Sequence, residues 1–274
     1  MLLKEIENFL EEDLGPEDYE WIVPSTDCKA AITVKEEGIL AGLEEAMQIF
    51  EYFAVDCSTE FDDGDRIKSG DTVLTLKGPG ARILKAERLV LNFLGRMSGV
   101  ATLTNEFVRE ARKVNAQVKI AGTRKTTPGF RKYEKKAIAI GGGDPHRFGL
   151  SDAVMIKDNH ILLMGLENAL KKAKERVSFT RKIEVEVESI EDALRAAELK
   201  VDIIMFDNMR PGEIRECVRV LTERGLRDGL ILEASGGINL ENVKEYAATG
   251  VDVVSIGMIT HSPRSLSFSL HVVD

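Results

Sequence analysis

The sequence predicts an α/β protein in two parts, and two observations support this prediction. Over the first third of the chain, helical stretches and strands with an apolar period of two follow one another without regular alternation, as in an α+β domain. From about residue 118 onward, strand, loop and helix repeat in order, which is typical of parallel sheets joined by helices. We therefore expect an α+β domain over residues 1–114 and an α/β barrel domain over residues 115–274.

The first part contains the elements of a small sheet domain. A helix is predicted over residues 2–13, where Leu3, Ile6, Phe9 and Leu10 share one face. Strands are predicted over residues 30–34 and 72–76, with a helix over 42–53 between them and turns at 62–65 and 77–80. A long helix follows over residues 81–114, and Ser98-Gly99 is expected to break or kink it.

The second part supplies six strands with helices between them. The strands are predicted over residues 118–122, 153–157, 182–187, 203–206, 229–234 and 252–256, and the helices over 165–176, 190–199, 211–224 and 240–248. Such a series fits a (β/α) barrel, complete or open, and a doubly wound sheet is the alternative. Because the first two strands are far apart in the chain, residues 126–151 are expected to form a large binding loop with some helix.

The composition excludes several classes of protein. A formal net charge of −9 argues against a nucleic-acid binder, because the overall field repels phosphate backbones. No apolar run approaches the roughly 20 residues that span a bilayer. The acidic amino-terminal stretch lacks the order of a signal peptide, and three scattered cysteines show neither metal-binding nor disulfide spacing. We therefore expect a cytoplasmic protein that binds neither nucleic acid nor membrane.

Cationic side chains gather where two predicted strands end. Arg124 and Lys125 follow the first strand of the barrel and Lys157 ends the second, while His146 and Arg147 lie between them after a run of three glycines. Cations at the carboxyl ends of parallel strands point into the mouth where such folds bind ligands. This pattern predicts a small substrate rich in carboxylate or phosphate, and solvated surface charge is the alternative.

Carboxylates follow on the next strands. Glu184, Glu186 and Glu188 alternate along one predicted strand and would share a face, and Asp207 ends the next strand. An inward carboxylate near a strand end needs a cation, a metal ion or hydroxyl groups as its partner. The pair Glu186 and Asp207 therefore suits Mg²⁺-assisted chemistry on a phosphorylated sugar or direct binding of a ribose diol. Ion pairing with nearby lysines is the alternative.

A glycine-rich turn follows the fifth predicted strand of the barrel. Ser235, Gly236 and Gly237 lie in this turn, and Gly257 follows the sixth strand. Exposed backbone N–H groups in such turns bind phosphate, and the late strands of a barrel commonly carry such sites. A helix cap in which the glycines serve only tight turning is the alternative. We expect His160 and His261 to be structural hydrogen-bonding groups, and residues 132–136 to have a solvated face.

These motifs together resemble a known family, quinolinate phosphoribosyltransferase, also called carboxylating nicotinate-nucleotide pyrophosphorylase. The resemblance extends over nearly the whole chain and rests on the following segments, in order: Glu12-Asp13-Leu14-Gly15, Ala86-Glu87-Arg88, Ser98-Gly99-Val100, Arg124-Lys125-Thr126-Thr127-Pro128-Gly129, Gly141-Gly142-Gly143 with His146-Arg147, Ile156-Lys157-Asp158-Asn159-His160, Ile183-Glu184-Val185-Glu186-Val187 and Ser235-Gly236-Gly237. It implies an N-terminal α/β sandwich and a C-terminal open α/β barrel.

The resemblance also implies a reaction and an assembly. Quinolinate would be joined to 5-phosphoribosyl-1-pyrophosphate with Mg²⁺, giving nicotinate mononucleotide, pyrophosphate and CO₂ in the de novo route to NAD. The chain would form a homodimer, with the N-terminal domain of one subunit covering the barrel mouth of the other. The rival interpretations are a phosphoribosyltransferase that acts on nicotinate without decarboxylation, and a barrel that only binds a phosphorylated metabolite.

Roles for single residues follow from the same resemblance. Thr123 is expected among the substrate-binding residues, Arg124, His146 and Arg147 would bind the carboxylates of quinolinate, and Arg88 would come from the partner subunit. Lys125, Lys157, Glu186 and Asp207 would be the catalytic set, with Glu186 and Asp207 near Mg²⁺, directly or through water. Ser235, Gly236, Gly237 and Gly257 would bind the 5-phosphate. Two departures from the family pattern, at residues 16–20 and at Pro145, remove no charged ligand.

Overall fold

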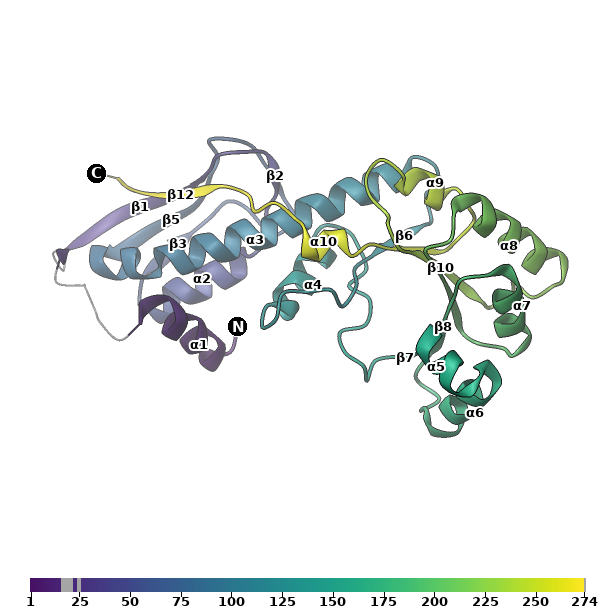
Figure 1. Ribbon diagram of the computed structural model, residues 1–274. Coiled ribbons are helices and arrows are strands. Elements are labelled where there is room, and N and C mark those ends of the chain that lie inside the picture. Colours follow the sequence, from purple (N-terminus) through teal and green to yellow (C-terminus); the bar gives the residue numbers. More distant parts are fainter. Residues whose placement is uncertain (16–21, 24–25, 274) are drawn as a thin grey trace. The chain divides into compact units, whose positions relative to one another are not determined.

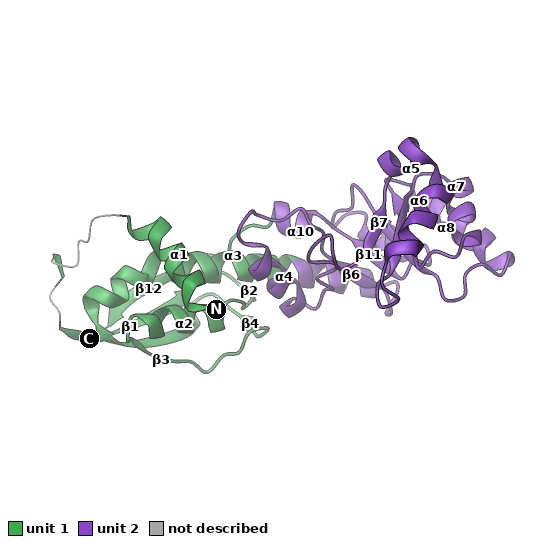
Figure 2. Ribbon diagram, turned by 90° about the horizontal axis from the view of Figure 1, so that it is seen from below, with its two compact units in different colours: residues 1–103, 263–274 green, residues 104–262 purple. Residues whose placement is uncertain are grey.

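The computed structural model describes residues 1–15, 22–23 and 26–273, so the atypical segment Pro16–Glu20 lies outside the described residues. The chain forms two compact units, one of residues 1–103 with 263–274 and one of residues 104–262 (Figure 2). This division differs from the boundary expected at residue 114. The reason is that one long helix runs from the first unit into the second, and the last strand of the chain pairs within the first unit.

The first unit is built on a four-stranded antiparallel sheet in the order β12-β1-β5-β3 (Figure 1). Its strands are β1 (Asp27–Val34), β3 (Asp56–Ser58), β5 (Thr72–Pro79) and β12 (Phe268–Val273), and a separate pair is formed by β2 (Gly38–Ile39) and β4 (Arg66–Ile67). The helices are α1 (Leu3–Leu14), α2 (Leu43–Tyr52) and the first part of α3 (Gly80–Arg112). The predicted α+β architecture is confirmed. The turn expected at residues 77–80 is wrong, because β5 continues to Pro79 and α3 begins at Gly80.

The helix α3 continues through Ser98-Gly99, so the expected break there is wrong. A Cβ atom on Gly99 would lie 2.1 Å from the backbone oxygen of Arg264, and one on Gly95 would lie 2.8 Å from that of Leu266. The Leu266 N–H donates to the Gly95 carbonyl at 3.0 Å. The glycines are therefore needed for the close approach of the segment that leads to β12, and not for a kink.

The second unit is a six-stranded parallel sheet in the order β6-β11-β10-β9-β8-β7. Its strands are β6 (Lys119–Ala121), β7 (Val154–Ile156), β8 (Ile183–Val187), β9 (Ile203–Asp207), β10 (Ile231–Ser235) and β11 (Val253–Ser255). Five strands follow chain order from β7 to β11, and β6 then pairs with β11. This is the order of a barrel left open between β6 and β7, and it excludes the doubly wound alternative, in which strand order reverses.

Helices join these strands. They are α4 (Arg131–Ile140), α5 (Asp158–Met164), α6 (Leu166–Arg176), α7 (Ile190–Glu198), α8 (Pro211–Glu223), α9 (Val243–Ala247) and α10 (Met258–His261). The helices α6 to α9 agree with the predicted ones, whereas α5 and α10 were not predicted. Val185, Ile204 and Leu232, on three adjacent strands, are fully buried in the core of this unit. Within the described residues, no helix is both long enough and apolar enough to cross a bilayer.

Candidate active site

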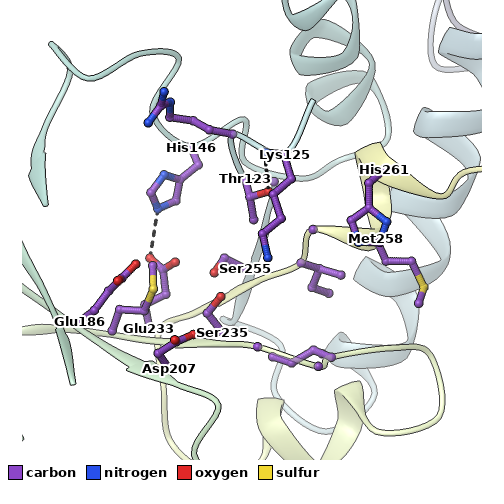
Figure 3. Close-up of a pocket in the computed structure, with 18 of the residues that line it drawn as sticks. Thr123, Lys125, His146, Glu186, Asp207, Glu233, Ser235, Ser255, Met258 and His261 are labelled. Atoms are coloured by element: carbon purple, nitrogen blue, oxygen red, sulfur yellow. Dashed lines mark hydrogen bonds and ion pairs between the residues drawn. The ribbon is translucent and has the colours of Figure 1, made fainter. Parts of the chain in front are cut away.

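One cavity of about 600 Å³ gathers the predicted site residues of the second unit (Figure 3). It lies at the carboxyl ends of the parallel strands, because Lys157, Asp207 and Ser235 end or directly follow β7, β9 and β10. The predicted residues that line it are Thr123, Arg124, Lys125, His146, Arg147, Lys157, Glu186, Asp207, Ser235, Gly236, Gly237 and Gly257. These predicted residues therefore line one cavity, and their roles in binding and catalysis stay predictions.

Two lysines line this cavity. Lys125 follows β6, and its backbone carbonyl accepts a hydrogen bond from the Thr260 hydroxyl at 2.8 Å, which anchors the strand end. Its side chain points into the cavity, toward Ser255 and Ser235, in Figure 3. Lys157 follows β7, and its Nζ lies 2.5 Å from Oε1 of Glu186 on β8. Both lysines are thus held at the cavity, one of them by an ion pair with a carboxylate.

His146 and Arg147 lie in a loop that is fixed by several hydrogen bonds. His146 has a φ of 57°, a conformation that few non-glycine residues adopt. Its N–H donates to Oδ1 of Asp144 at 2.7 Å, and the Nζ of Lys135 on α4 donates to the carbonyl of Pro145. The backbone is therefore held on both sides of His146, and the unusual φ directs the ring into the cavity.

The helix α4 differs from expectation in its exposure. Tyr133, Glu134 and Lys135 are buried, so the prediction of a solvated face over residues 132–136 is wrong for these three, while Lys132 is exposed. Glu134 accepts hydrogen bonds from the backbone N–H and hydroxyl of Thr127, at 3.0 and 2.8 Å. Glu134 and Lys135 therefore hold the binding loop from inside the helix.

The alternating glutamates of β8 reach three different environments. Glu184 is fully buried, Glu186 lines the cavity, and Glu188 is exposed beyond the strand end. Burial, with the charge of Glu233 second, raises the pKa of Glu184 to about 7. The prediction that all three share one face of the strand applies only to Glu184 and Glu186, because the strand ends at Val187.

Glu233 on β10 is a site residue to which the sequence assigned no role. Its carboxylate is 2% exposed, and its Oε2 lies 3.2 Å from Nε2 of His146. Among the described residues, His146, Glu184 and Glu233 form a group of possible metal ligands whose atoms lie within 4.8 Å of one another. The pair that we predicted near a metal ion, Glu186 and Asp207, also lines the cavity but lies outside this group.

The glycine-rich turn after β10 is shaped by close packing. Gly236 has a φ of 94°, and a Cβ atom there would lie 2.2 Å from Oδ1 of Asn208. Gly237 has a φ of 61° and nothing within 4 Å of such an atom. Only glycine therefore fits at Gly236, and the bare backbone at Gly237 stays open, which suits the predicted binding of a phosphate.

Other lining residues were not predicted, and the histidines differ from one another. The unpredicted ones are Gly122, Met155, Met205, Glu233, Ile238, Asn239, Ser255, Ile256, Met258 and His261.

His160 accepts a hydrogen bond from the Lys157 N–H through Nδ1 at 3.0 Å, so its structural role is confirmed. His261 lines the cavity, which the expectation of a structural role missed. Its position a few residues beyond the end of a barrel strand could have predicted that His261 lines the cavity.

Arg88 is the exception among the predicted site residues. It is exposed on α3 in the first unit, and it is not among the described residues that line the cavity. Its expected role depends on a partner subunit and stays a prediction.

The open barrel and its cavity define a class of protein, an α/β-barrel enzyme for substrates that carry carboxylate or phosphate groups. The sequence pattern of the quinolinate phosphoribosyl transferase C-terminal domain matches residues 100–271, and that of the N-terminal domain matches residues 18–98. The chain belongs to the quinolinate phosphoribosyl transferase family.

Individual relatives agree with this membership. A probable carboxylating nicotinate-nucleotide pyrophosphorylase of Methanothermobacter thermautotrophicus is 47% identical, with 97% of each chain covered. One of Archaeoglobus fulgidus is 50% identical, with 92% of this chain and 97% of the relative covered. The crystal structure of NadC from Streptococcus pyogenes superposes with a TM-score of 0.91 at 38% identity, covering 99% of this chain and 96% of that one.

Proposed function

We propose that this chain joins quinolinate to 5-phosphoribosyl-1-pyrophosphate, releasing nicotinate mononucleotide, pyrophosphate and CO₂ in NAD biosynthesis. Family membership supports the reaction. The main structural support for this reaction in this chain is the composition of the cavity. It brings Arg124, His146 and Arg147 together with Glu186 and Asp207, so that one pocket offers cations for a diacid and carboxylates for a sugar.

The cationic residues would bind the diacid. Arg124, His146 and Arg147 can each donate hydrogen bonds to a carboxylate, and guanidinium groups do so in a bidentate manner. A substrate with two carboxylates needs more cations than one with a single carboxylate. Three such donors in one cavity therefore support quinolinate over nicotinate as the acceptor.

The glycine-rich turn, the two carboxylates and the two lysines of the cavity would bind the phosphoribosyl donor. The turn of Ser235, Gly236 and Gly237, with Gly257, would hold the 5-phosphate through backbone N–H groups. Glu186 and Asp207 would accept hydrogen bonds from the ribose hydroxyls. Lys125 and Lys157 would neutralise the pyrophosphate and the substrate carboxylates.

The chemistry then follows from charge. The bond between C1′ and the pyrophosphate oxygen breaks, and the electron pair leaves with pyrophosphate. The pyridine nitrogen lone pair forms the new bond to C1′, whose developing positive charge Glu186 stabilises. The ring nitrogen is now cationic, so the ring accepts the electron pair of the C2–carboxylate bond as CO₂ leaves. A proton then adds to C2. Holding two polyanions side by side is the main task of the protein.

Mg²⁺ is proposed as the cofactor because the cavity offers carboxylate oxygens as ligands. Glu186 and Asp207 offer carboxylate oxygens in the cavity, and oxygen ligands of this kind are those that Mg²⁺ takes in phosphate-binding sites. When bound, the ion would neutralise charge on the leaving pyrophosphate. Glu186 already accepts the Lys157 ammonium, so this lysine and the ion would share the same carboxylate.

A homodimer is proposed as the assembly. In this proposal, Arg88 on α3 of one subunit adds a cation to the cavity of the other. The support is the residue itself, an exposed guanidinium within a motif that resembles the family's.

An end-point assay with 5-phosphoribosyl-1-pyrophosphate and Mg²⁺ tests the function, run in parallel with quinolinate and with nicotinate. Nicotinate mononucleotide and CO₂ from quinolinate alone are expected. Product from nicotinate alone would mean that the cationic cluster serves only phosphates. No turnover with either acid, combined with a rise in the thermal midpoint on adding either, would favour a protein that only binds these metabolites.

A further inference from the structure

In the chain, the helix α4 separates the two segments that carry the predicted diacid-binding residues. Residues 123–127 precede the helix and carry Arg124, and residues 144–148 follow it and carry His146 and Arg147. The side chains of all three line the cavity. A ligand whose two carboxylates contact both segments therefore depends on the spacing between these segments.

Arg131, the first residue of α4, contacts both segments at once. Its Nε donates to the Thr126 hydroxyl at 2.8 Å, and its Nη1 donates to the Phe148 carbonyl at 3.2 Å. A guanidinium group is planar, and its donors keep a fixed geometry. One side chain therefore links a point two residues after Arg124 to a point directly after Arg147.

The next buried residues of α4 hold one segment each. Glu134 is fully buried, and its two oxygens accept hydrogen bonds from the N–H and the hydroxyl of Thr127, at 3.0 and 2.8 Å. Lys135 is 4% exposed, and its Nζ donates to the Pro145 carbonyl, directly before His146. A shift of either segment therefore has to break a buried hydrogen bond to a charged group, which is costly.

Other contacts hold the part of the cavity that we assign to the phosphoribosyl donor. The Thr260 hydroxyl donates to the Lys125 carbonyl at 2.8 Å, and the Asn208 N–H donates to the Ser235 carbonyl at 2.9 Å. Neither contact involves α4. A change in α4 is therefore expected to alter the contacts of the diacid and to leave those of the donor intact.

We propose that Arg131 and Lys135 are positioning residues for the acid substrate. They fix the spacing between Arg124 and the pair His146-Arg147, so that the cavity selects an acid with two neighbouring carboxylates over an acid with one. The inference rests on the proposed function and adds the structural basis of its selectivity for quinolinate over nicotinate. A single carboxylate needs cations from one segment only, so its binding tolerates a change in the spacing.

The first test is Lys135→Met, which keeps an unbranched side chain of similar length and removes its donor. Steady-state assays give the KM for each substrate and the inhibition constant of nicotinate against quinolinate. The KM for quinolinate is expected to rise about tenfold, because misplaced cations lose contact with one of its carboxylates. The KM for 5-phosphoribosyl-1-pyrophosphate and the inhibition constant of nicotinate are expected to stay within about twofold.

The second test is Arg131→Lys, which keeps a positive charge at a partly exposed position. A lysine has a single terminal nitrogen, so it cannot reproduce the two fixed donors that reach Thr126 and Phe148. The KM for quinolinate is expected to rise about threefold or more, again without a change for the donor. Lys132→Met is the matched control, because it removes an exposed ammonium group from the same helix and should leave all three constants within about twofold.

Thermal unfolding of each variant separates positioning from loss of the fold. If Lys135→Met does not fold, Arg131→Lys decides the question. An unchanged KM for quinolinate in the folded variants, or an equal rise in the KM of both substrates, would overturn the inference and leave the proposed function standing. Absence of quinolinate turnover by the parent protein would instead reject the proposed function.

Discussion

The ion pair between Lys157 and Glu186 shows how single side chains prepare this cavity. The two groups are 2.5 Å apart, and Glu186 retains only 15% exposure of its side chain while Lys157 retains 44%. An ammonium held this way at the edge of the site can turn toward an incoming anion. In the proposed reaction the carboxylate it leaves behind would face the reacting sugar, where it can stabilise positive charge.

Replacement of this carboxylate is the first prediction. Glu186→Gln is expected to lower kcat by about 100-fold or more, because a charge that stabilises the transition state is lost. Quinolinate affinity, measured by calorimetry, should change little. Glu188→Gln is the matched control, since it alters an exposed carboxylate directly after the same strand. Equal kcat values for the two variants would contradict a catalytic role for Glu186.

The pH dependence of stability provides a second prediction. Burial, followed by nearby cations such as Arg131, lowers the pKa of Lys135 to about 8 from an ordinary value of 10.5. Between these values the unfolded lysine keeps a proton that the folded one has lost, so stability rises with pH in this window. Relative to Lys135→Met, the parent protein should gain about 2–3 kcal/mol of unfolding free energy between pH 7 and 10.

Denaturant titrations across this pH range measure the effect. Lys172→Met is the control, because it removes an exposed lysine from α6 and should leave the slope of the parent protein unchanged. Parallel curves for the parent protein and the Lys135 variant would show that this lysine keeps its proton on folding.

At this scale the sequence predicted the cations and the carboxylates of β8 and β9, and it missed Glu233 beside His146. Arg124, Lys157 and Asp207 were predictable because each stands at a strand end, where parallel strands converge. Glu233 looked like an ordinary position between the buried Leu232 and Ala234. Its partner is His146, which lies in a loop and has an unusual φ. No local sequence pattern predicts this contact.

At the scale of elements, α3 shows that a glycine inside a helix can serve packing. Ala is better than Gly in a free helix by about 1 kcal/mol. Gly99→Ala should nevertheless lower the free energy of unfolding by about 1–3 kcal/mol, because its Cβ would meet the backbone at Arg264. Gly212→Ala, where nothing lies within 4 Å, should be neutral or stabilising. Similar thermal midpoints for the two variants would contradict the packing explanation.

The repeated strands and helices of the second unit were predictable, and most short elements outside this repeat were not. All six strands of the barrel and the helices α6 to α9 were predicted within a few residues of their observed bounds. The sequence did not reveal β2, β3, β4, α5 or α10, which are too short to show a period. The strand β12 was also missed, although Leu266, Phe268 and Leu270 alternate, because its role depends on pairing with distant β1.

At the scale of the whole molecule, subunit sharing gives the fourth prediction. Arg88→Ala and Glu186→Ala proteins should each be nearly inactive, and mixing them should restore activity after subunit exchange. If subunits assort at random, about half of the dimers are hybrids, and each hybrid has one intact site out of two. About one quarter of the parental activity is therefore expected. Exchange can be followed with differently tagged subunits. If exchange is demonstrated and activity does not recover, Arg88 acts in the site of its own subunit or has no role in a site.

The pairing of β12 with β1 also bears on the order of events during translation. Residues 268–273 leave the ribosome after the whole of the second unit, yet they pair with a strand made near the start. During that interval β1 presents an unpaired edge, the kind of surface on which strands of other chains assemble. The barrel can fold while the first sheet still lacks one strand, so the nascent chain is most exposed to aggregation at its oldest end.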